Sequence, residues 1–186
     1  MNTRDALLDC AERAARARGY DGFSYADLAS EIGIRKASIH HHFPTKADLA
    51  LDLMRRYRER FFQTLEEIAR DAPRGADRVR GFLGVYRQAL GGGASACLCV
   101  MFSAGRDALS DPVLAELNRF HTDALAWLSE AFARACADGS IEDLAEPDAE
   151  AAACLALVEG AQLMARAATD VGLFDAAVTR LATRLG

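Results

Sequence analysis

Residues 24–46 read SYADLASEIGIRKASIHHHFPTK, and this stretch decides the fold. Ser24 and Asp27 have the spacing of a capping box, in which a serine hydroxyl and an acidic side chain satisfy unpaired backbone N–H groups at the start of a helix. The helix that begins here should end near Ile32, because Gly33 readily takes the left-handed conformation that terminates helices. The spacing therefore predicts a short helix followed by a glycine turn.

The residues after the turn predict a second short helix, over Lys36–His42. It should end before Pro44, because the residue that precedes a proline avoids the helical conformation. Ala29 is small enough for the two helices to approach closely, and Ile39 can plug the corner between them. Two helices that meet at such a corner can form a helix-turn-helix, whose second helix fits the major groove of B-DNA, about 12 Å wide. An ordinary helical hairpin without DNA binding has the same spacing.

Helical patterns flank this corner on both sides. Apolar residues predict a helix over about 3–18. Thr45 and Asp48 form a second capping box, and an apolar stripe predicts a long helix from there to about Arg70, ended by Pro73–Gly75. The rest of the chain predicts five more helices, at about 76–90, 96–109, 112–137, 148–169 and 172–185.

Composition agrees with an all-α protein of 186 residues. Hydrophobic residues make up 51% of the chain, prolines number four, and no segment alternates in the manner of a β-strand. The N-terminus lacks the features of a signal peptide, and no unbroken apolar run reaches the roughly 18–20 residues needed to cross a bilayer. These features predict a soluble, cytoplasmic protein without a membrane partner.

The net charge of −5 argues at first against a nucleic-acid partner. The charge is unevenly distributed, however, because residues 1–74 carry a net +1 and residues 75–186 a net −6. DNA affinity depends on the basic groups that touch phosphates, so an acidic body is compatible with a DNA-binding head.

Residues 7–49 resemble the DNA-binding head of the TetR (tetracycline-repressor-like) family of transcription regulators. The resemblance covers about a quarter of the chain. Arg35 departs from the family pattern by standing at a usual serine or threonine N-cap, and His40 and His42 replace frequent tyrosines. The matching features, in order, are Gly19-Tyr20, Ser24, Asp27-Leu28-Ala29, the run from Gly33 to Lys46, and Leu49.

The resemblance implies a three-helix helix-turn-helix head over residues 1–46 and a helical effector-binding and dimerisation body over 47–186, with a linking helix at about 46–70. It implies a homodimer formed by the last two helices, which are apolar on more than one face, as a bundle between subunits requires. The function expected is that of a ligand-responsive regulator, usually a repressor, that binds a palindromic double-stranded DNA operator and is released by a small effector.

The DNA-contact candidates lie in and beside the second short helix. Lys36, Ala37 and Ser38 occupy its N-terminal turn, where lysine can read guanine, alanine a thymine methyl group, and serine a base or a phosphate. The polar side chains around them are expected to donate to DNA phosphates. The full set is Tyr25, Arg35, Lys36, Ala37, Ser38, His40, His41, His42, Thr45 and Lys46.

In the family, side chains on the body helices line an effector pocket, which is apolar with a few polar groups. The polar candidates here are Arg106, His121 and Gln162, which interrupt apolar surroundings. Packing in an ordinary core is the alternative for each candidate. The apolar candidates are Phe61, Phe62, Tyr86, Met101, Phe102, Phe120, Trp127 and Met164.

The chain has five cysteines, an odd number, and they are expected to be thiols. Cys97 and Cys99 suggest an alternative function, a sensor of oxidants or electrophiles on the same scaffold, which would need a lowered thiol pKa. The consecutive His40, His41 and His42 point about 100° apart on a helix and cannot converge on one metal ion. No metal or other cofactor is expected, and no nucleophile elbow, P-loop or Gly-rich dinucleotide turn indicates an enzyme. A helical interaction module without DNA binding is the remaining alternative.

Overall fold

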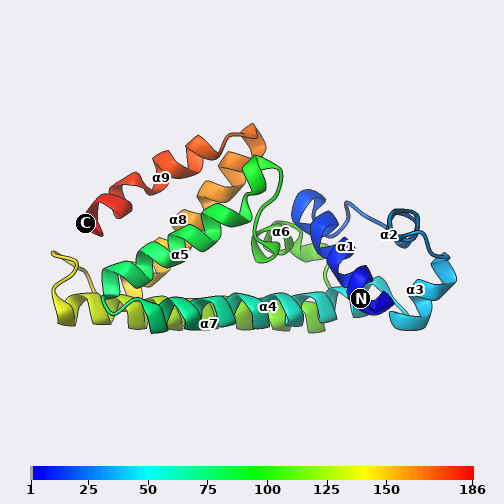
Figure 1. Ribbon diagram of the computed structural model, residues 1–186, viewed down its shortest axis with the longest axis horizontal. Coiled ribbons are helices and arrows are strands. Elements are labelled where there is room, and N and C mark those ends of the chain that lie inside the picture. Colours follow the sequence, from blue (N-terminus) through cyan, green and yellow to red (C-terminus); the bar gives the residue numbers. More distant parts are fainter. Residues whose placement is uncertain (1) are drawn as a thin grey trace. The chain divides into compact units, whose positions relative to one another are not determined.

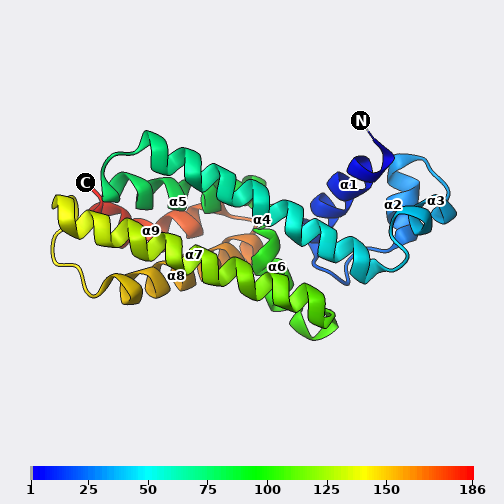
Figure 2. The ribbon, with the colours of Figure 1, turned by 90° about the horizontal axis from the view of Figure 1, so that it is seen from below.

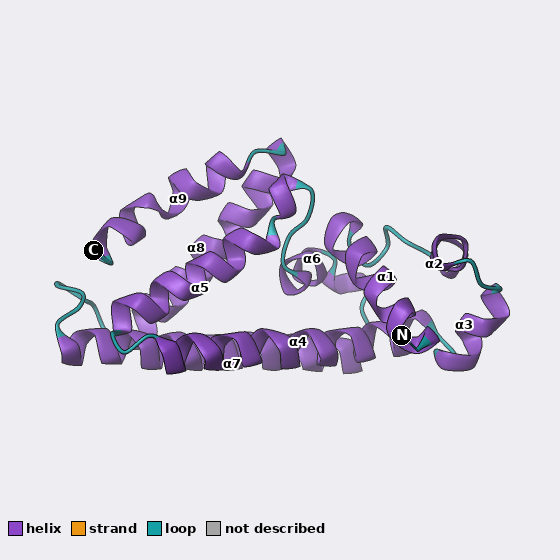
Figure 3. Cartoon of the chain, in the orientation of Figure 1, coloured by secondary structure: helices purple, strands orange, loops and turns teal. Residues whose placement is uncertain are grey.

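The computed structural model describes residues 2–186, which form α-helices and two short 3-10 helices but no strand (Figure 3). The expectation of an all-α fold is thus confirmed. The chain divides into two compact units. Unit 1 contains the described residues up to Glu59 together with Leu98–Arg119, and unit 2 contains Arg60–Cys97 and Phe120–Gly186.

Unit 1 contains the predicted helix-turn-helix and a segment from the middle of the chain (Figure 1). The first three helices begin and end where the sequence predicts. Leucines from three of its helices are completely buried, among them Leu7, Leu28 and Leu49. The elements of unit 1 are α1 (Thr3–Arg18), α2 (Tyr25–Ile32), α3 (Lys36–His42), the first part of α4 (Lys46–Asp71), α6 (Leu98–Ala104), the 3-10 helix η2 (Arg106–Ala108) and the start of α7 (Asp111–Asp138).

Within unit 1, α6 packs against α1 and the loop that follows it. The rings of Tyr20 and Phe102 meet edge to face, with their centroids 5.9 Å apart. Gly19 ends α1 with a φ of 79° and lies against Met101, since a methyl group on Gly19 would be 3.7 Å from Met101 Cε. The first helix of the head is therefore packed against a segment from later in the chain.

Unit 2 has an aromatic core. The rings of Phe61, Phe82, Tyr86 and Phe120 pack together, with centroid distances from 4.7 to 6.1 Å. Figure 2 shows α7 beside α8, where Ser129 donates a hydrogen bond to an Asp148 carboxylate oxygen. The elements are the rest of α4 and α7, α5 (Gly75–Ala89), the 3-10 helix η1 (Gly91–Gly93), α8 (Pro147–Ala168) and α9 (Val171–Arg184).

Gln162 is completely buried in α8 and ties two other segments of unit 2 together. Its amide oxygen accepts a hydrogen bond from the Cys97 N–H at 2.8 Å, and its amide nitrogen donates one to the Tyr86 carbonyl at 2.5 Å. Tyr86 belongs to α5 and Cys97 immediately precedes α6, so one side chain holds both ends of the connection that contains η1. Because buried polar groups need hydrogen-bond partners, these contacts explain a glutamine in an apolar interior.

One predicted helix is wrong, whereas the bounds of α4, α5, α7, α8 and α9 are correct to within one residue. The pattern over 96–109 predicts a continuous helix, but α6 ends at Ala104 and η2 follows. Gly105 leaves the helical conformation (φ −111°, ψ 28°), and its N–H bonds to the Phe102 carbonyl three residues back. Glycine is a poor helix former, and here it interrupts an otherwise regular apolar pattern.

Helix α8 is long and apolar enough to cross a membrane by the criteria of length and hydropathy alone. No unbroken apolar run in α8 reaches that length, because Glu159 and Arg166 interrupt its apolar stretch. Core helices of soluble proteins meet the same criteria, and 39% of the apolar window of α8 is buried inside the structure, where α8 packs against α9. Its composition is therefore only weak evidence of a membrane.

Gln162→Leu should lower the free energy of unfolding by about 2–4 kcal/mol. The substitution removes the interior partners that Gln162 supplies to the Cys97 N–H and the Tyr86 carbonyl, each worth about 1–3 kcal/mol when lost. Urea unfolding followed by circular dichroism measures the change. Gln88→Leu, at an exposed position of α5, is the matched control and should change stability by less than about 0.5 kcal/mol. Equal effects of the two substitutions would contradict the role given to Gln162.

Candidate nucleic-acid interface

Local hydrogen bonds build the corner between α2 and α3. The predicted capping box is present: the Ser24 N–H donates to Asp27 Oδ2 at 2.7 Å, and the Asp27 N–H donates to Ser24 Oγ at 3.3 Å. Gly33 ends α2 in the left-handed conformation (φ 72°, ψ 34°), and the Ile34 N–H donates back to the Ala29 carbonyl at 3.0 Å. The chain therefore leaves α2 through a tight turn and enters α3 directly.

Helix α3 is anchored by a single side chain. Ile39 is completely buried, and it is the one buried residue of this helix. Arg35 precedes the helix with extended backbone (φ −77°, ψ 142°) and makes no side-chain capping hydrogen bond. Lys36, Ala37 and Ser38 are exposed. The first turn of α3 thus presents its side chains to solvent, as contact with base edges requires.

A surface depression of about 570 Å³ lies between α3 and the start of α1. Thr3 begins α1 and was not among the predicted contacts, because no local sequence pattern connects α1 with α3. The rings of His41 and His42 meet edge to face at this depression, with their centroids 5.5 Å apart. The lining residues are Thr3, Ile34, Arg35, Ala37, Ser38, His41 and His42.

Tyr25 lies in the interior of unit 1 rather than on the predicted surface. Its side chain is 6% exposed, and its hydroxyl donates to the carbonyls of Phe43 at 2.9 Å and Thr45 at 2.5 Å. Burial raises the pKa of Tyr25, and the nearby Asp48 and Tyr20 add to this, so the hydroxyl stays protonated. The expected donation from Tyr25 to a phosphate does not fit this arrangement, because the single hydroxyl proton is shared between two carbonyls.

His40 and Thr45 are also engaged locally. Since a carbonyl can only accept, His40 Nδ1–H is the donor to the Pro44 carbonyl at 3.1 Å. His40 Nε2 can then donate to a phosphate only when the imidazole is protonated. The second predicted capping box is present as well, with Thr45 Oγ1 donating to Asp48 Oδ2 at 2.7 Å and accepting from the Asp48 N–H.

Lys46, the first residue of α4, is half-buried against the loop between α1 and α2. Its ammonium donates to the Phe23 carbonyl at 2.6 Å and lies over the rings of Tyr20 and Phe23, 4.5 and 4.4 Å from their centroids. Burial lowers the pKa of this ammonium, against the opposing effect of Asp21 and Asp27. Lys46 therefore has partners within unit 1 on three sides.

Arg35 and Lys36 carry the available positive charge of the α3 region. Elsewhere in unit 1 most arginines are paired with acids, as Arg13 of α1 is with Glu31 of α2 at 2.7 Å, whereas Arg18 and Arg119 are exposed without such a pair in the described chain. The side chains of Arg35 and Lys36 likewise form no ion pair or hydrogen bond with any residue of the described chain. Uncompensated cations on an exposed surface attract DNA phosphates.

Comparison with known proteins bears on this geometry. The family described as bacterial regulatory proteins, tetR family, matches residues 7–53. A TetR-family transcriptional regulator from Agrobacterium tumefaciens, of known crystal structure, is 30% identical, with a TM-score of 0.92 over 97% of this chain and 96% of that chain. The chain belongs to the TetR family. It is therefore a transcription regulator with a helix-turn-helix DNA-binding head, and the family is one of regulators rather than enzymes.

Two further proteins match this chain over shares of different size. The HTH-type transcriptional regulator CymR of Pseudomonas putida is 39% identical over 51 residues, which are 27% of this chain and 25% of CymR. The alignment thus spans about a quarter of that curated relative. AibR, crystallised in complex with isovaleryl coenzyme A and operator DNA, shares the fold at 22% identity, with a TM-score of 0.70 over 87% of this chain and 86% of AibR.

Most of the predicted effector contacts of this TetR-family chain gather in unit 2. Phe61 and Phe62 approach Phe120 with centroid distances of 4.7 and 5.7 Å, and Trp127 stacks on Phe82 at 5.8 Å. Their role toward an effector stays a prediction. The unit 2 candidates around the aromatic core are Phe61, Phe62, Tyr86, Phe120, His121, Trp127 and Gln162.

His121 places a polar group beside this aromatic core. Its ring meets that of Phe120 with a centroid distance of 5.7 Å, and its Nε2 lies 3.2 Å from Glu159 Oε1 on α8. The hydrogen bond to Glu159 raises the pKa of His121, although burial opposes the effect. An apolar core with a few polar groups at its edge has the composition of a small-molecule site. Gln162, in contrast, uses its amide to hold the backbone of unit 2.

The other predicted effector contacts lie elsewhere. Met101 and Phe102 belong to unit 1, where they pack against Gly19 and Tyr20. Arg106 is exposed in η2, because the break at Gly105 ends the apolar pattern of α6 before it. Met164 is 57% exposed on α8, one turn after the exposed Gly160. Arg106 and Met164 therefore do not lie in the interior of their units, and their role toward an effector stays a prediction.

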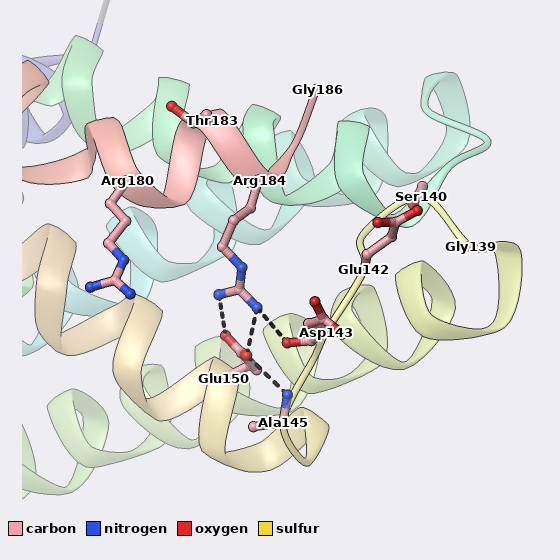
Figure 4. Close-up of a pocket in the computed structure, with 10 residues that line it drawn as sticks. All are labelled: Gly139, Ser140, Glu142, Asp143, Ala145, Glu150, Arg180, Thr183, Arg184 and Gly186. Carbon is pink, nitrogen blue, oxygen red and sulfur yellow. Dashed lines mark hydrogen bonds and ion pairs between the residues drawn. The ribbon is translucent and has the colours of Figure 1, made fainter.

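The loop before α8, α8 itself and α9 form a depression of about 1060 Å³, whose lining residues are drawn in Figure 4. Arg184 of α9 donates to Glu150 of α8 at 2.9 Å, and Arg180 lies one turn earlier in α9. Glu142 and Asp143 add two further carboxylates to its lining. Acidic and basic groups nearly balance here, so the charge favours neither a cation nor an anion.

The cysteines are thiols, as expected. Cys97 and Cys99 are 1% and 0% exposed, whereas reactive thiols lie in accessible, electropositive surroundings. Burial also raises the pKa of Cys10 to about 11 and that of Cys154 to about 12. This burial disfavours the thiol-sensor alternative. Across residues 2–186, no group of three or more His, Cys, Asp or Glu side chains is placed to hold a metal ion.

Tyr25→Phe should lower the free energy of unfolding by about 1–2 kcal/mol, because the Phe43 and Thr45 carbonyls lose their donor. Tyr20→Phe is the matched control, since the Tyr20 hydroxyl makes no hydrogen bond within the described chain, and it should be nearly neutral. Thermal unfolding and DNA affinity are measured for both variants. Unchanged stability of Tyr25→Phe together with a specific loss of DNA affinity would instead indicate a phosphate contact.

Proposed function

We propose that the protein is a repressor that binds operator DNA as a homodimer and releases it when a small effector binds. The observation that carries this proposal is the exposed first turn of α3, which presents Lys36, Ala37 and Ser38 beside Arg35 on an anchored helix. Two such helices in a dimer would enter major grooves on one face of DNA, at half-sites about 34–36 Å apart or a multiple of that spacing. A regulator of this kind would act in the cytoplasm.

The side chains of the interface have different proposed roles. Lys36 donates to guanine O6 and N7, Ala37 contacts a thymine methyl group, and Ser38 contacts a base or a phosphate. Arg35 and His41 contact phosphates, which position the protein without reading the sequence. Base preference therefore depends on α3, whereas general affinity depends on the cations around it.

The aromatic core of unit 2 supports an effector site. His121 and Glu159 form a half-buried polar pair next to Phe120, and this pair would orient a ligand that packs on the rings. AibR, which has the same fold, was crystallised with both isovaleryl coenzyme A and operator DNA. The effector proposed here is a small molecule with an apolar portion and at least one polar group.

Effector and operator would oppose each other by thermodynamic linkage. Helix α4 begins directly after the DNA-binding head and contributes residues to both units, so the backbone from the head into unit 2 is continuous along one helix. An effector can release DNA only if it prefers the arrangement that binds DNA poorly, and DNA must then weaken effector binding by the same factor.

The exposed face of α8 supports dimerisation. None of the eight exposed residues from Ala149 to Ala167 is charged, and the small residues among them let helices approach closely. Leu163 and Met164 are the exposed large hydrophobic side chains of the described residues, at 41% and 57%. A groove of about 240 Å³ runs between α8 and α9, partly lined by Leu157 and Leu181. In a two-fold interface, protruding side chains of one copy can fill the groove of the other. The exposed face comprises Ala149, Ala152, Ala153, Ala156, Gly160, Leu163, Met164 and Ala167.

Arg35→Ala should weaken binding to every DNA duplex and make the dependence of log K on log salt shallower by about one, the effect of losing one phosphate contact. Lys36→Ala should instead change base preference at one operator position by about 1–3 kcal/mol. Fluorescence anisotropy at several salt concentrations measures both effects. Arg119→Ala, at an exposed position of α7 outside the interface, is the control. An unchanged salt dependence for Arg35→Ala would contradict its role.

Met164→Glu and Gly160→Glu should each convert a dimer into monomers at micromolar concentration, because each buries an unpaired charge in an apolar interface. Multi-angle light scattering measures the mass. Ala133→Glu adds the same charge at an exposed position of α7 and should leave the dimer intact. A native chain that is monomeric would rule out the dimer, and variants that stay dimeric would rule out this face.

A further inference from the structure

Lysine is rare in this protein, and the structure treats its two lysines differently. The chain has 20 arginines but only Lys36 and Lys46, which both lie in the segment that contains the helix-turn-helix. Lys36 is exposed at the start of α3 and forms no ion pair or hydrogen bond through its side chain within the described chain. Lys46 is half-buried at the start of α4. The same residue type thus occurs once turned outward and once turned inward.

The inward position of Lys46 is defined by three contacts from one loop. The ammonium donates to the Phe23 carbonyl at 2.6 Å and lies 4.4 Å from the centroid of the Phe23 ring. The ammonium also lies 4.5 Å from the centroid of the Tyr20 ring. An ammonium has three N–H donors and is attracted to aromatic faces, so a carbonyl and two rings replace part of its water shell.

These contacts connect the loop before α2 with the turn after α3. Tyr25 makes a second connection between the same two segments, because its hydroxyl donates to the carbonyls of Phe43 and Thr45. Helix α3 lies between its glycine turn and this doubly connected segment. The contacts that hold the start of α4 against the loop before α2 therefore also fix the position of the C-terminal end of α3.

We propose that Lys46 is a positioning residue: its ammonium stays bound to Phe23 and Tyr20 and sets the orientation of α3, so it acts on DNA recognition through α3 rather than by contacting a phosphate. This inference rests on the proposed operator binding. The carboxylates of Asp21 and Asp27 lie near the ammonium and make the site less attractive to a phosphate. Its consequence is that Lys46 governs discrimination between sequences more than general affinity.

The shape of this site suits lysine and not arginine. An ammonium is compact and can approach one carbonyl and two ring faces at once, whereas a guanidinium is planar and wider. Lys46→Arg keeps the positive charge and should preserve an ordinary phosphate contact. Under the proposed role, Lys46→Arg should fail to hold α3 in its orientation, because the planar guanidinium cannot occupy the space of the ammonium.

The first test uses the native chain labelled with ¹³C and ¹⁵N at lysine, which gives signals from two residues only. Ring currents from Tyr20 and Phe23 should shift the Lys46 ε-proton signals upfield of those of Lys36. When the duplex that the protein enriches from a random-sequence pool is added, the Lys46 signals should keep this shift while the Lys36 signals move. Loss of the upfield shift of Lys46 on DNA binding would overturn the proposal.

The second test compares variants by their discrimination, the ratio of affinities for the enriched duplex and for a scrambled duplex of the same composition. Lys46→Arg should lower this ratio at least about tenfold, the effect of losing one good base contact, and should leave the salt dependence of binding to the scrambled duplex unchanged. Lys36→Arg is the matched control, because it makes the same exchange of an ammonium for a guanidinium at the exposed lysine. A ratio retained in Lys46→Arg would contradict the proposal.

The outcomes separate this inference from the function on which it rests. A native chain that enriches no sequence and binds no duplex contradicts the proposed function, and the role of Lys46 in recognition falls with it. Sequence-specific binding in which Lys46 releases its ring contacts contradicts the positioning role alone. If Lys46→Arg does not fold, the signals of the native chain still decide between the two roles.

Discussion

A seven-residue helix is not stable in isolation, so the surface that faces DNA depends on how α3 is held. Within this helix Ile39 alone is buried, and the packing of α3 depends on that one side chain. Hydrogen bonds close both ends, from the Ile34 N–H to the Ala29 carbonyl before the helix and from the Tyr25 hydroxyl to the Phe43 carbonyl after it. The remaining side chains of α3 are thereby left largely to solvent, where DNA can reach them.

This constraint divides the polar residues around α3 into two groups. Tyr25, Thr45 and Lys46 donate to groups of the protein itself and stabilise the turns on either side of the helix. Arg35 and Lys36 have no such partners in the described chain. So small an element is thus supported by neighbouring polar residues whose donors are engaged within the protein itself. The packing of α6 on α1 extends this supporting structure to residues distant in sequence.

Local patterns made most of the fold predictable from the sequence. Capping boxes and glycine turns depend on neighbouring residues, so they located α2, α3 and α4 correctly, whereas the break at Gly105 lay inside an apolar pattern and was missed. The sequence contains a pattern that predicts the burial of Tyr25, because Tyr25, Leu28 and Ala29 share one helical face. No local sequence pattern predicts the position of Lys46, since its partners are set by tertiary packing. Met164 was assigned to a pocket although its spacing from Gly160 places it on the exposed face of α8.

In the proposed dimer, two copies of the exposed first turn of α3 should read one operator. Selection of duplexes from a random-sequence pool by the native chain, followed by sequencing, tests it most directly. We expect an enriched motif with two-fold symmetry, whose half-sites are separated by one helical turn of DNA or a multiple of it. Enrichment of a single, asymmetric half-site, or of no sequence at all, would contradict it.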